Sequence, residues 1–141
     1  MILNTSIDNS YLYVYLSNIS NTKGIVHICH GKGEHIGRYK WLINKLNHDG
    51  YHVISIDHRG HGRWIKNNHK KGIFAETNGW EIITDDLKNL IISTSKNYPN
   101  LDQYLLAHSM GSWVALNLIM NDINIKGLII SGSSKFPAFL M

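Results

Sequence analysis

A serine lies where a strand-length apolar run meets a helical pattern, and this junction constrains the fold more than any other feature of the sequence. Residues 103–107 are mostly apolar and of strand length, and the apolar residues from Trp113 to Met120 recur at helical spacings. Between them stands the run Ala107–Gly111, AHSMG. Such a run has the shape of a nucleophile elbow, a sharp strand-to-helix turn that holds a serine oxygen clear of the sheet edge. We expect Ser109 to adopt a strained backbone conformation, at a cost of about 1 to 3 kcal/mol.

The residues around this serine meet one requirement of the elbow and leave another unmet. The small residues two places before and after it, Ala107 and Gly111, let strand and helix approach closely, although the usual motif has glycine in the first place. In this architecture the chain order is serine, then acid, then histidine. The residues after Ser109 contain one acid, Asp122, and no histidine, so a candidate nucleophile stands without its base. The alternative is an ordinary junction in which Ser109 only caps a helix.

A second segment provides what an acyl-transfer site needs beside a nucleophile. The apolar run 24–29 predicts a buried strand, and it leads directly into the glycine-containing stretch His30–Tyr39. A glycine-rich turn after an inner strand presents unshielded backbone N–H groups to a developing oxyanion. In the elbow fold one donor follows the nucleophile and the other comes from this turn, which predicts the backbone N–H groups of Met110 and Lys32. The residues expected to shape the site are His30, Gly31, Gly33, His108 and Gly111.

Three motifs together give the chain a specific resemblance. HGKGEHIGRY at 30–39, DHRGHG at 57–62 and AHSMG at 107–111 occur in the same order and at similar intervals as in the monoglyceride lipase and lysophospholipase branch of the α/β-hydrolase family. The resemblance covers nearly the whole chain but only the first half of the family's length. It departs from the family at Trp64, where the family usually has serine.

The resemblance implies a serine esterase that acts on monoacylglycerols, lysophospholipids or related carboxylic esters through an acyl-serine intermediate, with no cofactor and no metal. It implies a truncated α/β-hydrolase fold with a mostly parallel sheet of about six strands and flanking helices. The C-terminal strands, the lid and the last helices would be absent, and residues 1–141 would be the N-terminal part of a single domain. The family's acid and histidine lie in its second half, so we expect weak or no activity from this chain alone.

Alternating strand and helix patterns independently predict a mostly parallel sheet covered by helices. One helix is expected after the glycine-rich turn, ending near Gly50, and another between Asn78 and Pro99, where Asn78 and Glu81 resemble a capping box. A long loop is expected before Asn78. The expected strands cover residues 2–7, 11–16, 24–29, 51–56, 103–107 and 126–130.

Composition favours a soluble protein of the cytoplasm. Met1–Ser10 lacks the basic start and apolar run of a signal peptide, and no apolar stretch reaches the roughly 18 residues needed to span a bilayer. The single cysteine, Cys29, excludes an internal disulfide and is expected to be a small apolar strand residue. Much of the net charge of +4 lies in the run 63–71, which is a solvated loop or, alternatively, touches an anionic membrane surface. Binding to nucleic acid is not expected, because one short run supplies few phosphate contacts.

Other functional interpretations have weaker support in the sequence. The spacing of Gly31, Gly33 and Gly37 is one residue too long for a dinucleotide fingerprint in which Asp57 would bind a ribose. The pair His58 and His61 lacks the partners of a recognised metal site. The remaining acids considered for a catalytic role are Asp85, Asp86 and Asp102. The first two are expected in a helix, where they face solvent or the positive N-terminus of that helix, and Asp102 is expected in a turn.

The last predicted strand, near residues 126–130, is expected to leave one edge of the sheet unpaired. Such an edge is a template for pairing with another chain, and we expect an exposed apolar patch beside it. The chain also stops on the apolar residues 136–141. These features predict self-association or a complementing C-terminal fragment. The alternative to an enzyme is therefore an inactive interaction module, or a chain that needs a second one to supply aspartate and histidine.

Overall fold

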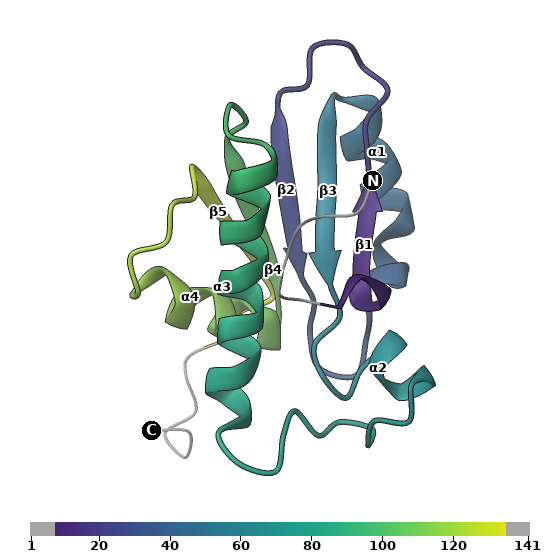
Figure 1. The fold of residues 1–141 in the computed structure, drawn as a ribbon, viewed down its shortest axis with the longest axis vertical. Helices are drawn as coiled ribbons and strands as arrows, with labels where there is room; N and C mark the ends of the chain where they lie inside the picture. Colours follow the sequence, from purple (N-terminus) through teal and green to yellow (C-terminus); the bar gives the residue numbers. More distant parts are fainter. Residues whose placement is uncertain (1–7, 135–141) are drawn as a thin grey trace.

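A mostly parallel sheet forms the centre of the molecule (Figure 1). The computed structural model describes residues 8–134, and its five strands lie in the order β1-β3-β2-β4-β5. Strand β1 is antiparallel to β3, and the other neighbouring pairs are parallel. The strands are β1 (Leu12–Tyr15), β2 (Gly24–Cys29), β3 (Tyr51–Ile56), β4 (Gln103–His108) and β5 (Gly127–Ser131). Five of the expected strands are thus confirmed, and the sixth, over 2–7, lies outside the described residues.

Helices cover both faces of this sheet, α1 on one face and α3 with α4 on the other (Figure 1). The helices expected after the glycine-rich turn and before Pro99 are confirmed. The short helix α2 was not predicted, because its four residues fall in the expected long loop and are too few for a periodic pattern. The helices are α1 (Lys40–His48), α2 (Arg63–Lys66), α3 (Gly79–Asn97) and α4 (Met110–Ile119), with 3-10 turns at Asn9–Tyr11 and Ile36–Tyr39.

Two hydrophobic clusters explain why the strands tolerate few polar residues. Successive side chains of a strand point to opposite faces, so β2 contributes Ile25 to one cluster and Val26 to the other. Ile25 packs in the same cluster as Leu90 of α3, and Val26 in the same cluster as Ile43 of α1. Burying one such aliphatic side chain contributes roughly 1.5 to 3 kcal/mol. A strand buried on both faces is therefore apolar along most of its length, as the sequence pattern indicated.

The start of α3 differs from the sequence-based expectation. Asn78 has left-handed backbone angles, φ 52° and ψ 34°, and its side chain makes no capping hydrogen bond. A capping box requires an extended backbone at the first position, so the predicted pairing of Asn78 with Glu81 is wrong. Asparagine tolerates the left-handed region better than most residues. Its carbonyl still accepts the N–H of Ile82 at 3.0 Å, which begins the helix without the side chain.

The outer strand β5 exposes apolar side chains. It pairs with β4 on one side, and within residues 8–134 no strand pairs with its other side. Ile129 is 59% exposed and Ile130 is 38% exposed, while Met120, just after α4, is 85% exposed. These values agree with the apolar edge expected from the sequence. No helix in the described part of the chain combines the length and apolarity needed to cross a membrane.

Candidate active site

The three motifs meet at the carboxyl ends of the parallel strands, where open α/β sheets commonly bind ligands. Cys29 of β2 lies opposite Ala107 of β4 in the sheet register. Gly31 and Ser109, each two residues further along, are therefore neighbours. A Cβ atom placed on Gly31 would lie 3.1 Å from the Cβ of Ser109. The structure thus brings the glycine-rich turn and the candidate nucleophile together, as the sequence analysis expected.

Ser109 occupies a strained turn between β4 and α4. Its backbone angles are φ 52° and ψ −122°, in a region that residues with side chains rarely adopt. The turn is held because the N–H of Ser109 donates to the carbonyl of Ser131 at 2.9 Å, and the N–H of Ser112 donates to the carbonyl of Ser109 at 2.9 Å. The predicted strained conformation is confirmed. Within residues 8–134 the Ser109 hydroxyl makes no hydrogen bond.

Gly111 lets α4 press against the end of β2. A Cβ at this position would lie 2.2 Å from the carbonyl oxygen of Cys29 and 2.6 Å from that of His30. Both are backbone atoms of the sheet and of the turn, so neither can move aside easily. The absence of a side chain at Gly111 therefore sets how closely the helix that begins after Ser109 approaches the glycine-rich turn.

Glu34 fixes the conformation of the glycine-rich turn. One oxygen of its carboxylate, Oε1, accepts the backbone N–H of Gly31 at 2.6 Å and the hydroxyl of Tyr39 at 2.5 Å. The N–H of Gly31 is thereby engaged within the protein. By contrast, the backbone N–H groups of Lys32 and Met110 donate no hydrogen bond within the part of the chain that the structure describes. These two donors are the ones that the sequence analysis predicted for the oxyanion.

The charge of Glu34 is stabilised by its neighbours. Burial by itself raises the pKa of Glu34, but the hydrogen bonds from Tyr39 and Gly31 and the nearby rings of His108 and His30 hold it below the ordinary value. The pKa of Tyr39 is raised, first by burial and then by its bond to Glu34. The carboxylate is therefore ionised at neutral pH and accepts both hydrogen bonds.

We expect the Gly31 amide to report the ionisation of Glu34. Because the pKa of Glu34 is lowered in the folded protein, its contribution to stability is present above the ordinary value of 4.5 and is lost as pH falls through the folded pKa. The ¹H–¹⁵N chemical shift of Gly31 should titrate with a midpoint below 4.5. Tyr39→Phe removes one bond to the charged form and should raise the midpoint, whereas Glu34→Gln should abolish the titration. An unchanged midpoint in Tyr39→Phe would show that the hydrogen bond from Tyr39 does not lower the pKa of Glu34.

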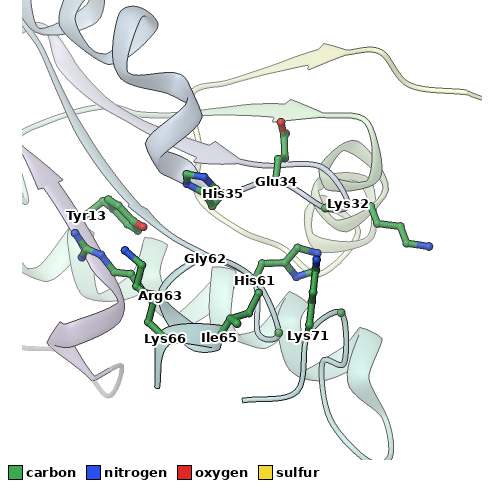
Figure 2. Close-up of a pocket in the computed structure, with 13 residues that line it drawn as sticks. Tyr13, Lys32, Glu34, His35, His61, Gly62, Arg63, Ile65, Lys66 and Lys71 are labelled. Carbon is green, nitrogen blue, oxygen red and sulfur yellow. The ribbon is translucent and has the colours of Figure 1, made fainter. Parts of the chain in front are cut away.

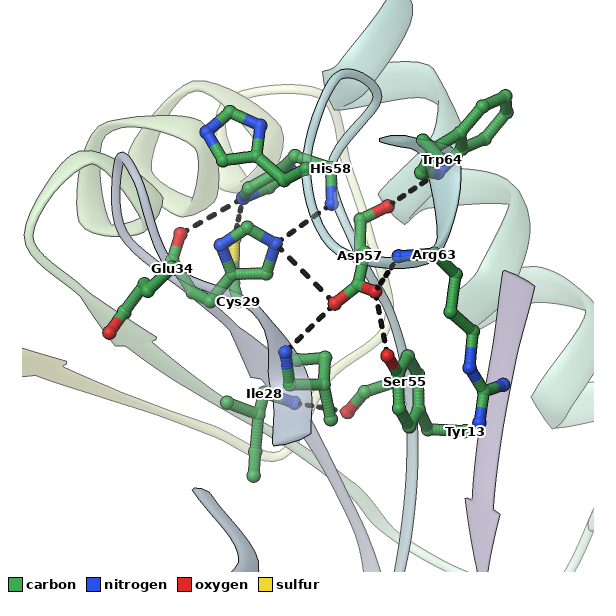
Figure 3. A network of polar contacts seen from close by, with 12 residues as sticks. Tyr13, Ile28, Cys29, Glu34, Ser55, Asp57, His58, Arg63 and Trp64 are labelled. Atoms are coloured by element: carbon green, nitrogen blue, oxygen red, sulfur yellow. Dashed lines mark hydrogen bonds and ion pairs between the residues drawn. The ribbon is translucent and has the colours of Figure 1, made fainter. Parts of the chain in front are cut away.

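Asp57 joins three segments beneath the glycine-rich turn (Figure 3). Its carboxylate is buried and accepts the backbone N–H of Ile36 at 2.8 Å, the hydroxyl of Tyr13 at 2.8 Å and the backbone N–H of Arg63 at 2.9 Å. The pKa of Tyr13 is raised, first by burial and then by this bond. Both oxygens of Asp57 are thus occupied within the protein. Asp57 cannot bind a ribose in this position, so the dinucleotide interpretation is excluded.

The buried histidines act as fixed hydrogen-bonding groups. Nε2 of His30 accepts the backbone N–H of His58 at 2.9 Å, so its proton is on Nδ1, which donates to the carbonyl of Gly31 at 2.8 Å. Nε2 of His58 donates to the carbonyl of His30 at 3.0 Å. Burial lowers the pKa of both rings, and both are neutral at pH 7. Within residues 8–134 no group of three potential ligands could hold a metal ion.

None of the remaining candidate acids makes a hydrogen bond with Ser109 within residues 8–134. Asp86 of α3 receives two hydrogen bonds from Arg59, at 2.7 and 3.0 Å, and so ties α3 to the loop after β3. Asp102 lies before β4, at the opposite end of that strand from Ser109, and its side chain is exposed. Asp85 is exposed on α3. The exposed positions of Asp85 and Asp102 agree with the sequence-based expectation. Asp86 lies in the expected helix, but its side chain is only 17% exposed and is paired with Arg59, so the expectation that it faces solvent is wrong.

Three further residues have defined structural environments. The Cys29 thiol is buried, donates to the carbonyl of Gly111 at 3.3 Å and has its pKa raised by burial, which is unlike a nucleophile. The ring of Trp64 stacks on Tyr11 with centroids 3.8 Å apart and donates its indole N–H to the carbonyl of Asp57 at 3.0 Å. His108, half-buried beside Ser109, lies 3.3 Å from the Ser131 hydroxyl through Nδ1.

Comparison with known proteins agrees with this geometry. A family model described as serine aminopeptidase, S33, matches residues 20–138. The chain belongs to this family of α/β hydrolases. The monoglyceride lipase homolog of Monkeypox virus is 33% identical over 119 residues, which are 79% of this chain and 38% of the viral protein. Monoglyceride lipase of Homo sapiens is 32% identical over 110 residues, 77% of this chain and 34% of the human protein.

A solved α/β hydrolase shows the same likeness in three dimensions. The carboxyl esterase of Bacillus coagulans, determined in complex with glycerol, superposes with a TM-score of 0.77 at 31% identity. The superposition covers 84% of this chain and 38% of the esterase. The chain thus spans between 34% and 38% of the length of these three relatives.

Sequence reasoning did not predict how Glu34 and Asp57 organise the site, although Asp57 was considered as a ribose-binding residue. Both lie inside the motifs at 30–39 and 57–62, and that position was the only available signal. The partners of Asp57 come from β1, from the 3-10 turn and from α2, at sequence separations of 44, 21 and 6 residues. A local pattern does not contain contacts at such separations.

Proposed function

We propose that this chain carries the nucleophile and the oxyanion donors of a serine carboxylic-ester hydrolase that acts on a lipid-like or other small ester. The observation that carries the proposal is the strained serine at the end of β4, directly beside the glycine-rich turn after β2. The names of the relatives, monoglyceride lipase and carboxyl esterase, support the same reaction class. We also propose that residues 1–141 are part of one α/β-hydrolase domain.

In the proposed mechanism the Ser109 oxygen attacks the ester carbonyl while a histidine takes its proton. The backbone N–H groups of Lys32 and Met110 bind the negative oxygen of the tetrahedral intermediate. The alcohol leaves with the proton, and water then releases the acid from the acyl-serine. No histidine ring within residues 8–134 makes a hydrogen bond with the Ser109 hydroxyl. Without that base a triad enzyme of a different fold loses on the order of a millionfold in rate, so we propose weak or no turnover by this chain alone.

We expect a fluorophosphonate probe to react slowly with Ser109 and with no other serine. The reason is that Ser109 combines a free hydroxyl with adjacent N–H donors, which also stabilise the phosphonylated serine. After long incubation with excess probe, peptide mass spectrometry should find the label on Ser109 and should find none in Ser109→Ala. Replacing the exposed Ser20 by alanine is the matched control and should leave labelling unchanged. Labelling of another serine in preference to Ser109, or equal labelling of Ser109→Ala, would overturn the proposed function.

A second candidate function, binding of another chain, is favoured by the open edge of β5. Ile129 and Ile130 expose apolar surface beside the backbone groups of this edge, which can pair with an added strand. The partner would be a second copy or a chain that supplies the acid and the histidine. One measurement separates these functions: a complementing chain raises the rate of Ser109 labelling, whereas a partner of an inactive interaction module does not.

A further inference from the structure

A cavity of about 660 Å³ lies between the turn after β2 and the loop after β3 (Figure 2). One side is formed by residues 32–35, which include the proposed oxyanion donor Lys32, and the other by parts of the segment 60–72. Its size falls in the range of small-molecule sites, roughly 300 to 1,000 Å³. The cavity therefore adjoins the proposed reaction centre and is large enough for part of a substrate.

The charges around this cavity are predominantly positive. Four cationic residues line it, and one carboxylate does. That carboxylate, Glu34, is already engaged by Gly31 and Tyr39, and Figure 2 shows it directed away from Lys66 and Lys71. Neither lysine forms an ion pair within residues 8–134. The cationic residues are Lys32, Arg63, Lys66 and Lys71.

Arg63 provides a positive charge whose position is fixed. Its guanidinium carbon lies 3.6 Å from the centre of the Tyr13 ring, a cation–π contact, and its Nη1 donates to the carbonyl of Leu12. The backbone N–H of Arg63 is held by the buried Asp57. A guanidinium has five N–H donors, and Nη1 carries only two of them. Within residues 8–134 the Nε and Nη2 groups of Arg63 make no hydrogen bond, so these donors of a cavity-lining residue remain available to an anion.

Lysine side chains and small residues complete the cavity. A Cβ placed on Gly33 or on Gly72 would meet no atom within 4 Å, so there is open space beside both. Ile65 adds an apolar wall. Lys66 and Lys71 are exposed and follow Arg63 in the chain. Figure 2 shows the ammonium of Lys32 pointing away from the other labelled groups, so its contribution is the backbone of the turn.

We propose that this cavity is an anion subsite that binds the phosphate group of a lysophospholipid-type ester. Arg63 and Lys66, which lie beside Tyr13 in Figure 2, bind the phosphate, Lys71 beside His61 adds positive charge to the same cavity, and the adjacent turn at Lys32 receives the ester carbonyl. The second half of this statement rests on the proposed function, because it assumes reaction at Ser109. The subsite distinguishes the two ester classes that the fold permits: an uncharged monoacylglycerol gains nothing from three cations, whereas a phosphate ester gains from each of them.

The test is a binding titration of the full chain that does not depend on turnover. Octanoylglycerol phosphate, monooctanoylglycerol and inorganic phosphate are each titrated at low salt by calorimetry. We expect the phosphate ester to bind at least about tenfold more tightly than monooctanoylglycerol. The reason is that only the phosphate ester can form ion pairs with two lysines and one arginine, and low salt screens these ion pairs little. The double variant Lys66→Gln, Lys71→Gln should lose most of that difference.

The matched control is Lys40→Gln with Lys96→Gln, which removes two exposed positive charges, one on α1 and one on α3, that do not line the cavity. This control should bind the phosphate ester within about twofold of the unmodified chain, since distant exposed charges are screened. Circular dichroism of both double variants checks that they remain folded. An equal loss in the control would mean that only net charge matters and would overturn the proposal.

The remaining outcomes also decide the matter. Equal affinity of the chain for the two octanoyl ligands overturns the proposal. If inorganic phosphate binds as tightly as the phosphate ester, the proposal is also overturned, because the site would then bind the free ion and not the ester. Association with phosphatidylserine vesicles but not with monomeric phosphate ester would assign these cations to a membrane surface instead. Because the titration measures binding without reaction, it tests the anion subsite independently of the proposed function. The chain can show no preference for the phosphate ester although Ser109 is labelled by the fluorophosphonate, and it can bind the phosphate ester tightly although Ser109 is not labelled.

Discussion

Replacing Asp57 with alanine is expected to lower the free energy of unfolding by about 3 to 5 kcal/mol, the range for breaking a buried charged network. The carboxylate is 1% exposed and accepts hydrogen bonds from Ile36, Tyr13 and Arg63. Alanine leaves the buried donors of Ile36 and Tyr13 and the part-buried N–H of Arg63 without this acceptor, and each buried donor left unpaired costs roughly 1 to 3 kcal/mol. The three donors belong to the turn, to β1 and to α2, so the site should loosen together with the fold.

Two graded variants make this prediction specific. Asp57→Asn keeps the shape and one oxygen but points an NH₂ group at a donor, so it should fall between alanine and the unmodified chain. Tyr13→Phe removes one partner and should cost about 1 kcal/mol, as for a typical single hydrogen bond. Urea denaturation followed by circular dichroism measures all three. If Asp57→Ala is no less stable than Tyr13→Phe, the network does not hold these segments together.

Replacing Gly111 with alanine is expected to destabilise the chain by about 3 kcal/mol or more, at the upper end of the effect of overpacking a core. The added methyl group would lie 2.2 Å from the carbonyl oxygen of Cys29 and 2.6 Å from that of His30. This steric overlap can be relieved only if α4 moves away from β2, and that movement shifts Ser109 relative to the glycine-rich turn. Labelling of Ser109 should therefore fall further than the loss of folded protein explains.

Gly127→Ala is the matched control, because it adds the same methyl group where the nearest atom is a side-chain carbon of Tyr104 at 3.3 Å. A ring can move by a few tenths of an ångström, so this variant should change the free energy of unfolding by less than about 1 kcal/mol. Thermal unfolding and probe labelling of both variants give the comparison. Equal behaviour of the two variants would show that close packing of α4 on β2 is not required.

The sequence predicted most of the secondary structure correctly. Periodicity located β2, β3, β4 and the helices α1 and α3, since each has enough apolar residues to show a period. It failed at the start of α3, where the left-handed backbone of Asn78 replaces a capping box, and at α2, which has four residues. Both failures concern short segments whose conformation is decided by neighbours and not by their own pattern.

The sequence predicted only those parts of the candidate site that belong to local motifs. Ser109, Lys32 and Met110 belong to local motifs, and the structure places the turn and the serine side by side. The motif residue His30 could be named, but its proton position follows only from its contact with His58. Trp64 belongs to the run 63–71 that was considered for a membrane contact, yet its ring stacks on Tyr11, which no local pattern indicates.

The sequence by itself determined the order of strands and helices, the α/β-hydrolase family and the position of the strained serine, because these depend on residues that are adjacent or regularly spaced. Only the tertiary structure decided that Glu34 accepts the Gly31 amide and that Asp57 is buried and accepts hydrogen bonds from three donors. It also decided that Arg63, Lys66 and Lys71 line one cavity together with the glycine-rich turn. These features depend on groups brought together by β1, β2 and β3 packing side by side, and the strength of a hydrogen bond or an ion pair depends on distance in space and not on distance along the chain.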